Sequence, residues 1–190
     1  MLFMNKFSEF LRFLLSKSPL NRGTINAERA KNVEVIEKLE KEKKISNLPK
    51  QGPELAERII DACEKYWEVH KSNCSGLVNA VADEFEVVLT GQANDIVDQI
   101  QNPPWKLLSD GVEADKKASE GKLVVAGLKS NPNGHVVIVV KRNKNQELAH
   151  GKYPFAYWGQ LNGIGRKMVT INYAWFKEDR DKVIYHYRDI

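Results

Sequence analysis

Cys74 is the side chain of this chain best placed to act as a nucleophile. It follows Ser72 and Asn73 and directly precedes an amphipathic run over residues 77–85. Either Ser72 or Asn73 can cap a helix here, because each side chain can accept a hydrogen bond from a free amide of the first turn. The aligned peptide dipoles at a helix start favour negative charge, so the pKa of a thiol falls there. The setting predicts a thiolate nucleophile near neutral pH.

A histidine further along the chain could serve as the base for this thiol. His135 opens an apolar run over residues 136–140, rich in β-branched residues and typical of a buried strand. Imidazole exchanges protons near neutral pH, so it can take the proton of a thiol. A cysteine at a helix start facing a histidine at a strand start is the arrangement of cysteine hydrolases. Taken alone, each residue is more often structural, because short motifs match by chance.

Small residues flank both members of the predicted pair. Ser75 and Gly76 follow the cysteine and would let a substrate chain approach the sulfur closely. Gly134 precedes the histidine and leaves room on one side of its imidazole. Amides at the helix start can supply part of an oxyanion site. We therefore expect Ser75, Gly76 and Gly134 to contact substrate.

The sequence predicts neither a metal site nor a bound cofactor. The two cysteines lie eleven residues apart and the four histidines are scattered, so no zinc-ligand spacing is found. The glycines at 159, 163 and 165 lack the strand-to-helix setting of a phosphate-binding loop. Cys63 falls on a predicted helix, where we expect a small buried residue and no disulfide to Cys74.

The elements that must position these residues come as helices first and strands afterwards. Apolar spacing predicts helices starting at 54 and at the cysteine, then over 91–100 and 110–120. After Gly121 the pattern predicts strands over 123–128, 135–140, 153–161, 169–176 and 183–187. This order indicates an α+β domain with a mainly antiparallel sheet.

Residues 1–52 are predicted to form a basic helical extension, and residues 53–190 the hydrolase domain. The first 50 residues contain 11 Lys or Arg and 6 Asp or Glu, whereas the remaining residues contain 18 and 19. The basic character thus belongs to the extension, and the nearly neutral domain does not have the charge of a nucleic-acid-binding surface.

An apolar stripe near the start of the extension recurs at helical spacing, at Phe3, Phe7, Phe10 and Leu14. We expect it to pack on the protein body or on a partner copy, with docking to a membrane surface as the alternative. Lys6, Glu9 and Arg12 interrupt the apolar run, which lacks the pattern of a secretory signal. No stretch is long and apolar enough to predict an integral membrane segment. We therefore expect synthesis in the cytoplasm without a signal peptide.

Several blocks of sequence occur in an order that matches a known family. The first are residues 73–78 (Asn-Cys-Ser-Gly-Leu-Val), 91–98 (Gly-Gln-Ala-Asn-Asp-Ile-Val-Asp) and 105–107 (Trp-Lys-Leu). Further blocks are residues 121–129 (Gly-Lys-Leu-Val-Val-Ala-Gly-Leu-Lys), 134–136 (Gly-His-Val), 152–154, 158–159 and 179–181 (Asp-Arg-Asp). Over about residues 54–188 the chain resembles the type VI secretion amidase effectors of the first group, within the NlpC/P60 papain-like superfamily.

The resemblance implies a papain-like NlpC/P60 fold, with helices packed on a mainly antiparallel sheet. It implies a peptidoglycan amidase that cleaves the stem peptide between γ-D-glutamate and meso-diaminopimelate, with Cys74 as nucleophile and His135 as base. A third polar group usually orients the histidine in this superfamily. Here Tyr157, Trp158 and Gln160 are candidates, and a main-chain carbonyl near Trp158 would serve equally well.

The resemblance also implies partners and a place of action. The expected partners are bacterial peptidoglycan stem peptides, a cognate immunity protein and a component of the secretion machine. The expected place of action is the periplasm of a target bacterium. Residues 1–50 have no counterpart in these compact effectors. Two other interpretations stay open: an endogenous or phage-type cell-wall hydrolase with the same chemistry, and a non-catalytic binding module that uses the N-terminal helices.

Overall fold

The structure, a computed structural model, describes residues 52–190, so the predicted basic extension lies outside the described residues except for Gly52. The elements run in the order α3 (Gly52–His70), α4 (Cys74–Asp83), α5 (Ala93–Ile100), β1 (Lys106–Leu108), α6 (Gly111–Ser119), β2 (Leu123–Leu128), β3 (His135–Val139), β4 (Phe155–Trp158), β5 (Arg166–Thr170) and β6 (Ile184–Arg188). Short 3-10 helices occupy Ile171–Tyr173 and Arg180–Lys182. Within these residues, no helix combines the length and apolar character that crossing a membrane requires.

The six strands form one sheet in the order β1-β6-β2-β3-β4-β5, and every neighbouring pair is antiparallel. In the central pair, β2 and β3, Leu128 lies opposite His135 and Val124 opposite Val139. The predicted α+β architecture with a mainly antiparallel sheet is therefore confirmed. The predicted order of helices before strands holds except for β1, which precedes α6.

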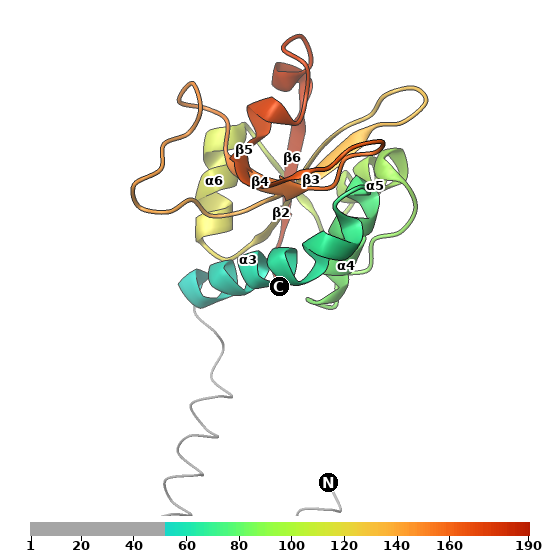
Figure 1. Cartoon of the computed structure of the whole chain (residues 1–190). Helices are drawn as coiled ribbons and strands as arrows, with labels where there is room; N and C mark the ends of the chain where they lie inside the picture. The colour runs from blue at the N-terminus through green and yellow to red at the C-terminus, as the bar shows by residue number, and fades with distance from the viewer. Residues whose placement is uncertain (1–51) are drawn as a thin grey trace, which may run out of the picture. The chain divides into compact units, whose positions relative to one another are not determined.

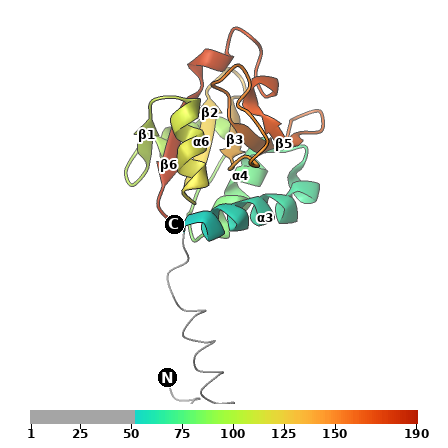
Figure 2. The same cartoon turned by 90° about the vertical axis from the view of Figure 1, so that its left-hand side faces the viewer.

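Helices cover both faces of the sheet (Figures 1 and 2). On one face α3, α4 and α5 pack through a cluster that includes Leu77, Ile96 and Ile138. On the other face α6 packs through Ala114 and Ala118. Successive residues of β2 and β3 face opposite sides of the sheet, and both sides are buried. This explains why both strands read as continuous apolar runs rather than as alternating ones.

Two strands differ from the sequence prediction. The predicted strand over 169–176 is instead the end of β5 followed by a 3-10 turn, because β5 begins earlier, where Arg166 pairs with Trp158 of β4. Arg166 and Lys167 are exposed, so the start of β5 lacks the apolar signal of a strand. The strand β1 was not predicted at all: it has three residues, and only Leu108 is buried.

Candidate active site

The start of α4 is fixed by Asn73, the residue before the cysteine. Asn73 has extended backbone angles (φ −146°, ψ 100°), and its side-chain oxygen accepts a hydrogen bond from the backbone N–H of Gly76 at 2.9 Å. Ser72, the other candidate cap, instead donates its hydroxyl to the carbonyl of Gly163 at 2.8 Å. Cys74 is thus the first residue of α4, as predicted, at the positive end of the helix dipole.

Replacing Asn73 with alanine is expected to lower the free energy of unfolding by about 1 kcal/mol, because the first turn of α4 loses its side-chain acceptor. Urea denaturation of the variant and of the unchanged protein measures this difference. Asn145→Ala is the matched control, since Asn145 lies exposed in a turn. Equal stability of the two variants would contradict a capping role for Asn73.

The body of α4 anchors the cysteine against the sheet. Leu77, Val78 and Val81 are fully buried in the core cluster on this face. Complete burial of an aliphatic side chain of this size contributes about 1.5–3 kcal/mol. The helix start is therefore held in place by the core, although Cys74 itself lies at the edge of that core and is 8% exposed.

His135 is the first residue of β3, also as predicted, and is half-buried. Burial lowers the pKa of His135 to about 4. Its imidazole is consequently neutral at pH 7 and carries a free lone pair that can accept a proton. This protonation state is the one that a general base requires at rest.

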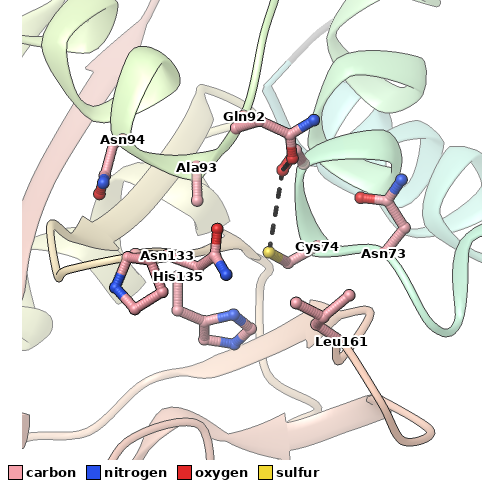
Figure 3. Close-up of a pocket in the computed structure, with 11 residues that line it drawn as sticks. Asn73, Cys74, Gln92, Ala93, Asn94, Asn133, His135 and Leu161 are labelled. Carbon is pink, nitrogen blue, oxygen red and sulfur yellow. Dashed lines mark hydrogen bonds between the residues drawn. The ribbon is translucent and has the colours of Figure 1, made fainter.

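One hollow brings the predicted pair together (Figure 3). Its lining residues are Asn73, Cys74, Ser75, Gln92, Ala93, Asn94, Pro132, Asn133, Gly134, His135 and Leu161. In Figure 3, Gln92 and His135 lie on opposite sides of the sulfur of Cys74. A thiol, a neutral imidazole and several amide groups thus share a concave surface, an arrangement that suits nucleophilic attack on a carbonyl group.

Two of the three predicted substrate contacts line this hollow. Ser75 is 4% exposed, and its Oγ lies 4.0 Å from the Sγ of Cys74 and 3.5 Å from Oε1 of Gln92. Gly134 lines the hollow too, but the structure gives a further reason for glycine, since a Cβ there would collide with the side-chain oxygen of Asn94. Gly76 is not among the lining residues, and its substrate contact stays a prediction.

The sequence analysis did not identify two side chains of this site, one asparagine and one glutamine. Asn94 donates to the carbonyl of Ser130 at 2.9 Å and accepts from the N–H of Ser130 at 3.2 Å, which ties α5 to the loop that leads to His135. Gln92 faces the hollow from the residue before α5. The only signal in the sequence was the block over 91–98, which matches the family but gives no role to either residue.

The three candidates for orienting the imidazole lie in different surroundings. Tyr157 donates its hydroxyl to Glu64 at 2.8 Å, Trp158 is fully buried, and Gln160 lines a hollow that His135 also lines. The ring of Trp175 meets that of His135 edge to face, with centroids 5.2 Å apart and planes at 67°. An aromatic contact of this geometry is favourable and limits rotation of the imidazole.

The two cysteines are both free thiols but differ in their surroundings. Cys63 is completely buried, and burial raises its thiol pKa, whereas Cys74 lines the hollow. Because the thiolate is the reactive form, iodoacetamide at pH 7.5 is expected to alkylate Cys74 at least about tenfold faster than Cys63. Peptide mapping by mass spectrometry after timed alkylation of the folded protein measures both rates. Comparable labelling of the two cysteines would contradict the assignment of Cys74 as the accessible thiol.

Within residues 52–190, no three His, Cys, Asp or Glu side chains are arranged to hold a metal ion.

No protein-family model matches the chain. The chain is similar to a protein of Pseudomonas aeruginosa named peptidoglycan amidase Tse1, with 35% identity over 139 residues. The alignment covers 67% of this chain and 87% of the relative.

Proposed function

Because the chain belongs to the Tse1-like family of peptidoglycan amidases, we propose that it hydrolyses the stem peptide of peptidoglycan with Cys74 as nucleophile and His135 as base. The observation that carries this proposal is one hollow lined both by a thiol at a helix start and by a neutral imidazole at a strand start. We also propose the papain-like NlpC/P60 fold that the sequence resembles, which the order of helices and the antiparallel sheet support.

The reaction would proceed in two halves. His135 accepts the thiol proton while the sulfur of Cys74 attacks the carbonyl carbon of the scissile amide. The first amides of α4, those of Cys74 and Ser75, have no partner within the helix and would donate to the developing oxyanion. Protonated His135 then gives its proton to the leaving amine, which departs and leaves a thioester on Cys74. Water, deprotonated by His135, hydrolyses the thioester and restores the thiol.

The bond that we propose to be cleaved lies between γ-D-glutamate and meso-diaminopimelate, on the basis of the resemblance. The test is digestion of sacculi from a diaminopimelate-containing bacterium by the full chain, followed by separation of the released fragments by mass. New fragments that end at γ-D-glutamate, with new free amines on diaminopimelate, are the expected result. Fragments cut at another bond would overturn the cleavage site but not the amidase activity, whereas intact sacculi would overturn both.

We further propose that the protein is an antibacterial effector that acts in the periplasm of a target cell and is blocked there by an immunity protein. The support is the resemblance to type VI secretion effectors and membership of the Tse1-like family. Expression in a bacterium with an added export signal is expected to cause lysis, and expression without it is not. Lysis from the cytoplasmic form, or from an exported Cys74→Ala variant, would contradict this proposal.

A further inference from the structure

A second hollow lies beyond His135 and has a volume of about 340 Å³. The residues that line it include Lys129, Gly134, His135, Tyr173, Phe176 and Asp179. Asn133, Gly134 and His135 line both hollows, whereas Cys74 lines the first one alone. The imidazole therefore stands between the hollow that contains the sulfur and the hollow that does not.

The chemistry of the proposed reaction decides which half of a substrate reaches the second hollow. The base that takes the thiol proton must return it to the leaving nitrogen, so that nitrogen has to lie against the imidazole. The acyl half stays bonded to Cys74 as the thioester. The half that begins with the leaving nitrogen then extends past His135, away from the sulfur and into the second hollow.

The second hollow combines opposite charges with exposed aromatic rings. Lys129 and Asp179 supply an ammonium and a carboxylate, while Tyr173 is 59% and Phe176 78% exposed. Lys129 is paired with both carboxylate oxygens of Asp98, at 2.8 and 2.7 Å, and about half of each side chain in this pair is exposed. Exposed ion pairs of this kind contribute little stability, so a charged ligand can replace them.

Asp179 sits in a turn whose backbone is already fixed. Its N–H and that of Arg180 both donate to the carbonyl of Phe176, at 3.0 and 3.2 Å, and the guanidinium of Arg180 donates to the carbonyl of Trp175 at 3.2 Å. The carboxylate accepts from Lys182 at 2.8 Å, and 35% of this side chain is exposed. The block over 179–181 therefore holds a carboxylate at the wall of the hollow, and a binding group fixed in this way loses little entropy when a ligand arrives.

We propose that the second hollow is the leaving-group subsite and that it binds a side chain carrying both an ammonium and a carboxylate. Asp179 pairs with the ammonium, Lys129 with the carboxylate, and the rings of Tyr173 and Phe176 cover the aliphatic stem that carries both groups. This inference rests on the proposed function, because diaminopimelate, on the amino side of the proposed bond, carries such a side chain. It adds the residues that would select this group over lysine or an amidated form.

The test compares cleavage of four synthetic L-Ala-γ-D-Glu-X tripeptides by the full chain. X is meso-diaminopimelate, its side-chain amide, L-lysine or Nε-acetyl-lysine. Asp179→Asn is expected to lower kcat/KM at least about tenfold on the three substrates with a side-chain ammonium, mainly through KM, and to leave the acetyl-lysine substrate unchanged. Lys129→Gln is expected to remove the preference for diaminopimelate over its amide.

Two exposed residues outside the hollow provide controls with the same change of charge. Glu178→Gln and Lys144→Gln are expected to keep the substrate ranking of the unchanged protein, since neither residue lines the hollow. If the unchanged protein cleaves all four substrates equally, or if Asp179→Asn keeps the substrate ranking of the unchanged protein, the proposed subsite is wrong while the amidase activity stands. If the unchanged protein cleaves neither these tripeptides nor sacculi, the proposed function itself fails.

Discussion

Replacing Cys74 with alanine is expected to lower the rate of stem-peptide cleavage by about 10⁴-fold or more, to the background of the assay. Removing the nucleophile of a covalent mechanism removes the thioester path, and His135 can then activate only a water molecule, which is a much weaker nucleophile than a thiolate. Cys74→Ser should be nearly as inactive, because a hydroxyl is far harder to deprotonate than a thiol. Mass analysis of digested sacculi measures the loss, and circular dichroism checks that the variant is folded.

Cys63→Ala is the matched control, because it removes the same sulfur atom from the other cysteine. Cys63 is completely buried on α3 and takes no part in either hollow. The control should cleave at close to the unchanged rate, with at most a modest loss of stability from the small cavity. Substantial cleavage by Cys74→Ala, or equal loss in both variants, would overturn the assignment of the nucleophile.

The sequence carried enough information to place the thiol and the imidazole on their elements, because the signals for both are local. A capping side chain at Ser72 or Asn73 followed by an amphipathic run predicts where α4 begins. A β-branched run after Gly134 predicts where β3 begins. Neither prediction depends on which distant segment packs against the element.

What the sequence did not predict depends on contacts between distant segments. The loop after β4 is held to the segment before Cys74 by the N–H groups of Gln160 and Gly165, which both donate to the carbonyl of Lys71, at 3.0 and 2.7 Å. These bonds join residues about 90 positions apart and leave no periodic signal. The same holds for Trp175, which contacts His135 from a segment that the sequence pattern predicted to be a strand.

Gly134 was predicted to belong to the site, but the reason given for a glycine at this position is only one of two. Its expected role was to leave space beside the imidazole, and it does line both hollows. The closest approach, however, is made by Asn94 of α5 and by the carbonyl of Leu128, which leave no room for a Cβ. Substrate contact and close packing both favour glycine, and only the structure shows the second.

Replacing His135 with alanine is expected to lower kcat at pH 7 by about 10²–10⁴-fold, because the thiol loses its general base. The pH profile should change as well. In the unchanged protein, activity should persist well below pH 6.5 and fall only toward about pH 4, where His135 takes up a proton and can no longer accept one. In the variant, the residual activity should rise with pH, because only spontaneous ionisation of the thiol then supplies the thiolate.

The measurement is kcat/KM from pH 4 to 9, with the folded fraction determined at each pH. The pKa of His135 is lower in the folded protein than its usual value near 6.5, so the unfolded chain binds more protons in the interval between them. Stability should therefore fall as the pH drops from about 6.5 toward 4, and this loss must be separated from the loss of the base. An acid limb at pH 6.5 in fully folded protein would show that burial does not hold His135 neutral. A variant with an unchanged rate and profile would show that His135 is not the base.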